Sequence, residues 1–100
     1  MNNDNPGPMT LFRIFVGGVN ERESFRAVLD EFLINYGYIV YFGEGHWKGQ
    51  KEGTAVIEVY AREAFRDTAQ TLATKLQTVF NQKVVAMAEH NTMVGFYYVD

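Results

Sequence analysis

Cysteine is absent from this sequence, and serine occurs only once, at Ser24. The absence of cysteine excludes disulfides, thiolate nucleophiles, cysteine-ligated zinc and iron–sulfur clusters. Ser24 lies within a predicted helix and has no candidate base near it, so a Ser-His-Asp triad has no place to assemble. Thiol chemistry and serine-dependent acyl transfer are therefore excluded from the functions of this chain.

A surplus of positive charge is also missing. Nine lysines and arginines stand against twelve carboxylates, which gives a net charge of -3. That balance disfavours nucleic acid and anionic membranes as partners. No apolar run approaches the roughly 20 residues that cross a bilayer, and the first nine residues lack the basic start and apolar centre of a signal peptide. We expect a flexible tail at residues 1–9 and a cytoplasmic protein.

Apolar side chains are abundant: 47% of the 100 residues are hydrophobic and 15% are aromatic. This composition is too apolar for a disordered chain. A chain of this length has room for one hydrophobic core. We therefore expect a single domain over residues 10–100.

Runs of β-forming residues that end at glycines or other turn residues predict five strands. They cover residues 11–16, 38–42, 54–60, 83–89 and 93–99. A glycine-rich turn at residues 43–53 joins the second strand to the third, and a turn at residues 90–92 joins the fourth to the fifth.

Apolar residues at helical spacing predict two amphipathic helices, at residues 21–35 and 62–80. Asn20 and Glu23 have the spacing of a capping box, and Gly37 stands where a left-handed residue ends a helix. The expected buried residues are Phe25, Val28, Leu29, Phe32 and Tyr36 in the first helix and Phe65, Ala69, Leu72, Leu76, Val79 and Phe80 in the second.

This order of elements is β-α-β-β-α-β with one extra strand at the C-terminal end. Two right-handed β-α-β units joined by a hairpin give an antiparallel sheet of order 4-1-3-2 with both helices on one face. The predicted fold is thus a ferredoxin-like α+β sandwich. In it the glycine-rich turn lies at the same end as Gly17-Gly18.

The glycine-rich turn is the best candidate for a ligand site, since it holds four of the nine glycines, the only tryptophan and one of two histidines. Glu44, His46, Trp47, Lys48 and Lys51 are placed to form a small polar pocket that glycines open to a ligand. The alternative is an ordinary turn whose Trp47 packs back on the sheet. If the chain were an enzyme, His46 would be the general acid or base and Glu44 its orienting partner.

We predict no metal ion and no cofactor. His46 and His90 lie at opposite ends of the predicted sheet, so the chain lacks a plausible metal-binding set. Gly17-Gly18 before a helix is typical of phosphate sites, but Glu21 and Glu23 in the first turn would repel an anion. Helix capping explains these carboxylates better.

Residues 13–19, Arg-Ile-Phe-Val-Gly-Gly-Val, resemble the first-strand motif of RNA-recognition-motif domains. That resemblance implies bases stacked on aromatic residues of the first and third strands. Here a threonine and two valines occupy positions 54, 56 and 59, where that family carries rings, and only Phe15 and Tyr60 remain. Binding of single-stranded RNA is therefore an alternative function.

Four short motifs resemble those of a family of small bacterial domains of unknown function. They are a strand ending at Val16-Gly17, the Gly-x-Gly-x-Trp turn at residues 43–47, Glu52 with the strand after it, and Phe-x-Gln-x-x-Val at residues 80–85. The resemblance covers residues 11–99 and implies the same fold without an activity. It marks Trp47 and Gln82 as positions to test.

Two helices can cover only one face of the predicted sheet. On the other face we expect an apolar interface, with Arg13 and Glu58 as a cross-strand ion pair. Its predicted members are Leu11, Phe15, Val56, Tyr60, Phe96 and Tyr98.

Several aromatic rings in water exceed the apolar patch that a monomer usually shows. The leading hypothesis is therefore a non-enzymatic binding module that forms a homodimer through this face. A different protein as partner, as for a phage-encoded inhibitor of a host protein, is the alternative.

Overall fold

The computed structural model describes the backbone of residues 7–94 and the side chains of residues 9–90. Four strands, two α-helices and one short 3-10 helix follow one another along the chain. They are β1 (Gly7–Gly17), α1 (Arg22–Leu33), β2 (Tyr38–Trp47), β3 (Gln50–Ala61), η1 (Glu63–Phe65), α2 (Arg66–Val79) and β4 (Ala86–Val94). Among these residues no helix is long and apolar enough to cross a membrane.

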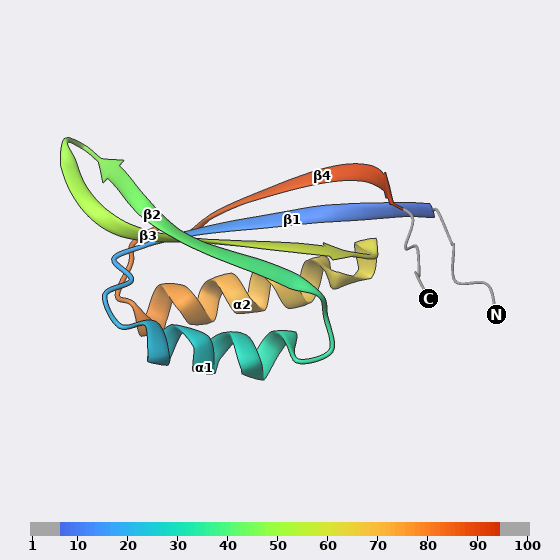
Figure 1. The fold of residues 1–100 in the computed structure, drawn as a ribbon, viewed down its shortest axis with the longest axis horizontal. Helices are drawn as coiled ribbons and strands as arrows, with labels where there is room; N and C mark the ends of the chain where they lie inside the picture. Colours follow the sequence, from blue (N-terminus) through green and yellow to red (C-terminus); the bar gives the residue numbers. More distant parts are fainter. Residues whose placement is uncertain (1–6, 95–100) are drawn as a thin grey trace, which may run out of the picture.

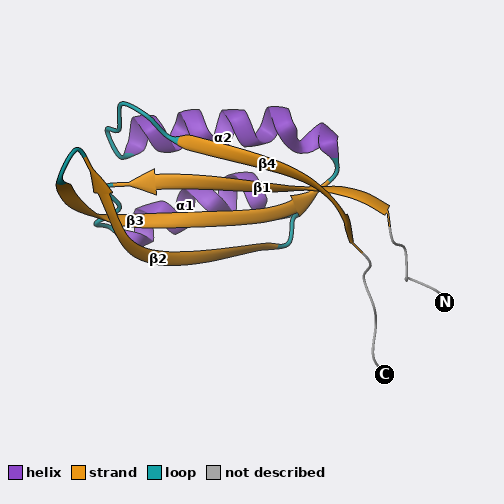
Figure 2. Ribbon diagram, turned by 90° about the horizontal axis from the view of Figure 1, so that it is seen from above, coloured by secondary structure: helices purple, strands orange, loops and turns teal. Residues whose placement is uncertain are grey.

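The strands form one antiparallel sheet in the order β2-β3-β1-β4. Both helices lie against the same face of this sheet, and within residues 7–94 no helix covers the opposite face (Figures 1 and 2). The predicted ferredoxin-like α+β sandwich and its strand order are thus confirmed. We call the face without helices the open face.

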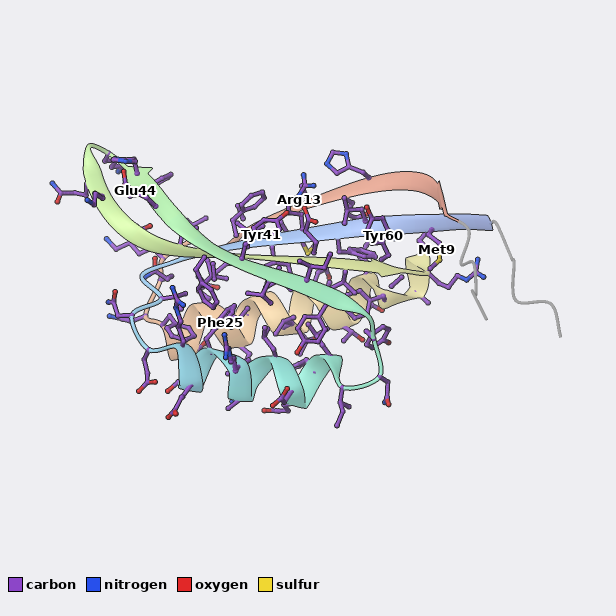
Figure 3. The ribbon with its side chains drawn as sticks, in the orientation of Figure 1. Met9, Arg13, Phe25, Tyr41, Glu44 and Tyr60 are labelled. Carbon is purple, nitrogen blue, oxygen red and sulfur yellow. The ribbon has the colours of Figure 1, made fainter. Side chains whose placement is uncertain are left out.

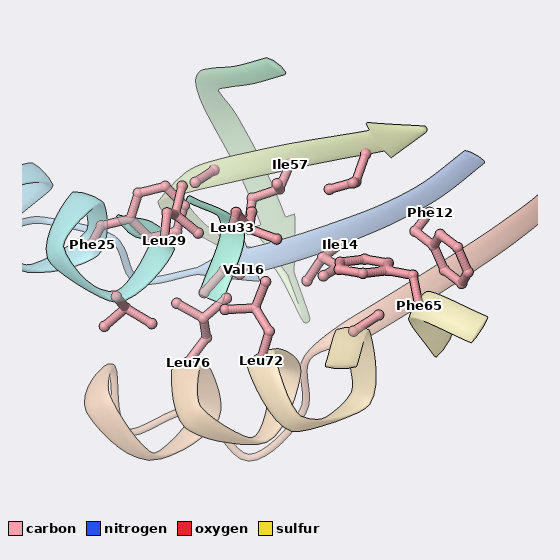
Figure 4. Packing of buried hydrophobic residues seen from close by; sticks show 14 of the residues in the cluster. Phe12, Ile14, Val16, Phe25, Leu29, Leu33, Ile57, Phe65, Leu72 and Leu76 are labelled. Atoms are coloured by element: carbon pink, nitrogen blue, oxygen red, sulfur yellow. The ribbon is translucent and has the colours of Figure 1, made fainter. Parts of the chain in front are cut away.

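The hydrophobic core fills the space between the sheet and the two helices (Figure 4). Phe12 of β1 meets the edge of Phe65, with ring centroids 5.2 Å apart. Phe25 of α1 packs in the same edge-on way against Phe42 and Phe80. The inward residues of β1 and β3 alternate with outward ones, as expected for a sheet that is covered on one side.

The ends of α1 differ from the prediction. Glu21, and not Asn20, is the N-cap, and its Oε1 accepts a hydrogen bond of 3.2 Å from the Glu23 amide. Gly37 does not adopt a positive φ. The helix ends earlier instead, where the Tyr36 amide donates to the carbonyl of Leu33.

Two apolar residues of the predicted helical stripes are exposed. Tyr36 lies beyond the end of α1, although its ring still packs 4.5 Å from that of Phe65. Val79, in the last turn of α2, is 42% exposed. Leu33 is fully buried in the first helix, where the prediction had omitted it. The second predicted helix begins as the 3-10 turn η1, which lacks a side-chain cap.

The predicted turn at residues 90–92 is wrong. β4 passes through these residues without a break, and His90 pairs with Leu11 while Asn91 pairs with Thr10. β1 is longer than predicted and begins at Gly7. Each of residues 90–92 therefore has a pairing partner in β1. Tertiary pairing overrides the turn propensity of Asn91. The predicted fifth strand begins within β4, and its remainder lies outside the described residues.

The predicted eleven-residue turn at 43–53 is also wrong. β2 and β3 stay paired up to Trp47 and Gln50, and only Lys48 and Gly49 form the turn. Both adopt positive φ, 50° and 79°, the pattern of a type I′ hairpin turn. β1 ends at Gly17, opposite Thr54. Residues 44–53 therefore project beyond the sheet as a two-stranded arm that curves away from the helices (Figure 1).

Candidate functional site

The two faces of the arm carry different side chains, because successive residues of a strand point to opposite sides. Glu44 and His46 lie on the side of the helices, and Lys51, the partner of His46 in the ladder, lies there with them. His46 Nε2 is 2.7 Å from Glu44 Oε2, and Lys51 Nζ is 3.5 Å from Glu44 Oε1. All three side chains are exposed, so this cluster adds little stability.

The structure thus divides the four predicted ligand-binding residues. Trp47 points to the opposite side of the arm from Glu44 and His46, and its side of the ladder continues into the open face. Trp47 is 60% exposed and does not pack back on the sheet. Lys48, in the turn, places its Nζ 5.8 Å from the centre of the indole ring.

A groove of about 720 Å³ runs between the arm and the loop at residues 81–84. Its volume lies in the range of small-molecule sites. Aromatic, acidic, amide and glycine residues share its lining, which draws on three parts of the chain that are far apart in the sequence: the end of β1, the arm, and residues 81–86. The lining residues are Phe15, Gly17, Gly45, His46, Trp47, Lys48, Glu52, Thr54, Asn81, Gln82, Lys83, Val84 and Ala86.

Glu52 is the half-buried carboxylate of this groove. Its side chain lies so close to Gly17 that a Cβ on that residue would collide with the carboxylate. No hydrogen bond or ion pair joins Glu52 to any residue whose side chain the structure describes. A carboxylate in this state has free acceptor capacity that faces the groove.

The loop that forms the other wall is held by the end of α2. Gln77 Nε2 donates a hydrogen bond of 2.7 Å to the backbone carbonyl of Lys83. The backbone N–H of Gln82 donates to the backbone carbonyl of Gln77. The side chain of Gln82 packs on Gly18, where a Cβ would collide with it. Asn81 adopts a positive φ of 52°. The groove therefore has a second wall in a defined conformation.

A second hollow, of about 530 Å³, lies on the helix side of the arm. Three glycines line it, together with Asn20, Glu44, Lys51 and Glu52. The amide of Val19 donates to the carbonyl of Gly53 over 3.2 Å, which ties the base of the arm to the chain before α1. Glu52 borders both hollows.

Four of the six residues predicted for the interface lie on the open face, and Tyr60 is labelled among them in Figure 3. Phe15 and Tyr60 are 37% and 42% exposed, and Val56, the ladder partner of Phe15, is half-buried. Leu11 lies on the same face but is only 9% exposed, which contradicts its predicted exposure. Tyr60 and His90 flank it in the ladder and shield it. Phe96 and Tyr98 lie outside the described residues.

A charged network crosses the middle of the open face. The Nε and Nη2 atoms of Arg13 both lie 2.7 Å from Glu58 Oε2, as the predicted ion pair requires. The hydroxyl of Tyr41 and the guanidinium of Arg13 donate to Glu58 and lower the pKa of its carboxyl group. The same contact with Glu58 raises the pKa of Tyr41. Around this network, apolar and aromatic side chains such as Phe15, Val56 and Tyr60 share the face with the polar side chains of Thr54 and His90.

A second ion pair joins α2 to β4. Arg66 Nε and Nη2 donate to the two carboxylate oxygens of Glu89 over 2.7 and 2.8 Å, and Glu63 lies 3.3 Å from Arg66 Nη1. These hydrogen bonds lower the pKa of Glu89. The contact is bidentate and joins α2 to β4, the edge strand of the sheet.

Several residues that form the groove were not predicted as site residues from the sequence. Glu52 and the loop at residues 81–84 had been noted only as parts of short motifs. The two-residue turn was the missing signal, because a turn at Lys48-Gly49 pairs Gly45 with Glu52 and puts Glu52 on the side of Trp47. Phe15 had been assigned to the interface and to the RNA-binding alternative, and it also lines the groove.

Together, the two-layer fold and the projecting β2–β3 arm define the class of this protein: a ferredoxin-like α+β domain with a groove at the base of a hairpin. The chain matches no family model and no curated protein sequence. Solved structures with the same fold do match it.

CPII, a PII-like nitrogen regulatory protein from Thiomonas intermedia, is similar at 17% identity and a TM-score of 0.61, over 94% of this chain and 100% of that one. It was solved with ADP, AMP and bicarbonate. A phage SAM lyase in complex with S-methyl-5′-thioadenosine matches at 17% identity and a TM-score of 0.59, over 100% of this chain and 98% of that one.

A Bacillus cereus protein related to NIF3 is 15% identical, with a TM-score of 0.60, over 91% of this chain and 27% of that one. At these identities the comparisons show the fold alone. They agree with the sheet order and the single helical layer.

Proposed function

We propose that this protein is a small non-enzymatic binding module that takes an adenine-containing small molecule in the groove between the arm and residues 81–84. The observation that carries the proposal is the groove itself, with Phe15, Trp47 and Glu52 on its walls. Aromatic rings offer a stacking surface for a base, and a carboxylate accepts hydrogen bonds from a ribose or an amine.

The ligands of the similar structures support this choice. CPII is bound to ADP and AMP, and the phage SAM lyase is bound to S-methyl-5′-thioadenosine. Adenine with a ribose is the chemistry common to these complexes. In our chain the glycines at positions 17 and 45 border the groove, and the side chains of Glu52 and Thr54 fill the space beside them and present polar atoms there.

Trp47 is the only tryptophan, so its fluorescence is a direct reporter of the groove. We expect saturable changes in emission when AMP, ADP and S-methyl-5′-thioadenosine are titrated, because a base next to the indole displaces water. Phe15→Ala should weaken the binding of these ligands. Ile34→Ala, which alters an exposed residue at the end of α1, should leave it unchanged. If none of the three ligands changes the emission or the melting temperature, the proposal is wrong.

Self-association is a second candidate function, favoured by the open face. Four large apolar side chains of this face are at least one-third exposed, namely Phe15, Ile39, Tyr41 and Tyr60, and Figure 3 labels Tyr41 and Tyr60 among them. The charged residues in its centre, Arg13 and Glu58, neutralise each other. A second copy therefore meets no excess of like charge, although each chain has a net charge of -3. We propose a homodimer through this face.

Analytical ultracentrifugation tests the homodimer. The wild type should sediment as a dimer at low micromolar concentration, and Tyr60→Glu should be monomeric, because it puts a charge into the apolar surface. Ile34→Glu adds the same charge on the other side of the molecule and should leave the dimer intact. A monomeric wild type would disprove the homodimer, and the protein partner considered in the sequence analysis would then replace it.

Absence of catalysis stays a prediction. The similar phage protein is a SAM lyase, so the direct test is to incubate the purified protein with S-adenosylmethionine and to look for S-methyl-5′-thioadenosine by chromatography. Turnover would show an enzyme. No product beyond that of a blank, together with saturable binding, would support the binding module.

A further inference from the structure

We infer that the groove recognises a positively charged organic group, an ammonium or another onium centre, between the carboxylate of Glu52 and the ring of Trp47. The inference rests on the proposed function, because it assigns a chemical class to the ligand of the same groove. Three observations lead to it: the state of Glu52, the environment of Trp47 and the placement of the lysines.

Glu52 is the first observation. It is half-buried, and among the described side chains it has neither a hydrogen bond nor an ion pair. The other half-buried acidic residue, Glu58, is paired with Arg13. Removing a carboxylate from water without a partner costs free energy, and a cation restores that loss. The absence of a side chain at Gly17 leaves room for the carboxylate beside the groove, where its free acceptor atoms are available to a ligand.

Trp47 is the second observation. Its ring lies on the same side of the arm as Glu52, and the two residues line the same groove. The Lys48 ammonium already lies 5.8 Å from the centre of this ring, so the π-face is accessible to positive charge. A carboxylate beside an aromatic face is a suitable site for an organic cation, because the ring quadrupole and the full negative charge attract it together.

The lysines are the third observation. Lys51 pairs with Glu44 on the other side of the arm, and so it is occupied elsewhere. Lys48 and Lys83 line the groove but are exposed and do not pair with Glu52. The two lysines are therefore suited to bind an anionic group of a ligand at the rim of the groove. The more buried Glu52 is suited to bind a cationic group. A ribose hydroxyl is the neutral donor that competes with a cation for Glu52.

Two nucleosides distinguish a cationic partner of Glu52 from a neutral hydroxyl donor. Adenosine and 5′-amino-5′-deoxyadenosine differ at one atom, and the second carries an ammonium group at neutral pH. We expect the wild type to bind the amino nucleoside about tenfold more tightly, as a charge-assisted contact provides. Glu52→Gln should abolish this preference and retain binding of adenosine. Glu31→Gln, the same change at an exposed position of α1, should keep the preference.

The outcomes distinguish this inference from the proposed function. Equal affinities in the wild type, or a preference that survives Glu52→Gln, would overturn the cation site while adenosine binding still supports the groove. Failure of both nucleosides to bind would contradict the adenine part of the proposed function. Tetramethylammonium chloride, titrated against sodium chloride with Trp47 emission as readout, then decides the cation site alone. A response that Glu52→Gln removes supports it, and no response overturns it.

Discussion

The carboxylate of Glu52 lies directly against the α-carbon of Gly17, at the point where β1 ends and the arm begins. The two residues are 35 positions apart in the sequence. A side chain on residue 17 would occupy the space that Glu52 fills. The position of the Glu52 carboxylate in the groove therefore depends on a glycine at residue 17.

Gly17→Ala should change ligand binding more than stability. The added methyl group displaces the end of a flexible side chain, so we expect a change in the free energy of unfolding below about 1 kcal/mol. Affinity for adenine nucleosides should fall, because Glu52 leaves its position. Gly43→Ala is the control, since a Cβ there meets nothing within 4 Å. Equal affinities of the two variants in a Trp47 titration would contradict the role of the Gly17 contact.

The stability of the arm should change when a substitution at Lys48 or Gly49 alters the preference of that residue for positive φ. Lys48→Asn should stabilise the arm by about 0.5 kcal/mol, because Asn-Gly is preferred in type I′ turns. Gly49→Ala should destabilise it by about 1 kcal/mol. Amide hydrogen exchange across residues 44–53 measures both effects. Protection that is unchanged in both variants would mean that the turn is not the I′ type.

Glu58 should make stability depend on pH on the acid side. Hydrogen bonds from Tyr41 and Arg13 lower its pKa in the folded protein below the ordinary value of 4.5. Its contribution is thus present above about pH 4.5 and is lost as the pH falls through the lower folded-state pKa. Glu58→Gln should flatten this part of the curve in urea titrations. Glu31→Gln, at an exposed position of α1, should reproduce the wild-type curve.

Substitutions at two residues of α2 should differ in their effect on the free energy of unfolding, because one side chain is buried and the other is exposed. Leu76 is fully buried in the core, so Leu76→Ala should reduce the free energy of unfolding by about 2–5 kcal/mol. Val79→Ala should cost less than about 1 kcal/mol, because that side chain is already exposed. Chemical denaturation of both variants provides the comparison. A similar cost for the two would place Val79 in the core after all.

The order of elements and the position of the helices could be predicted because they depend on local patterns. The period-two alternation of β1 and β3 fixes which of their residues face the helices, and Ile14 and Ile57 are both fully buried as expected. The ion pair of Arg13 with Glu58 followed from the same alternation once the two strands were placed side by side. These features need only short-range sequence information and the handedness of β-α-β connections.

The groove could not be predicted, because pairing between strands overrides the preference of single residues. Four glycines suggested a long loop at residues 43–53, yet the ladder of β2 and β3 continues through three of them. In the same way β1 holds His90 and Asn91 in a strand. Hydrogen bonds between neighbouring strands supply the free energy that a glycine or an asparagine lacks on its own.

The sequence by itself determined the chemistry that is excluded, the sandwich of one sheet and two helices, and the face that lacks a helical cover, because these follow from composition and from periodicity along the chain. Tertiary structure alone decided that the arm is a paired hairpin, that Trp47 faces away from His46, and that Glu52 meets Gly17 without a partner of its own. Those relationships depend on register, and one residue of shift in register moves a side chain to the other side of a sheet.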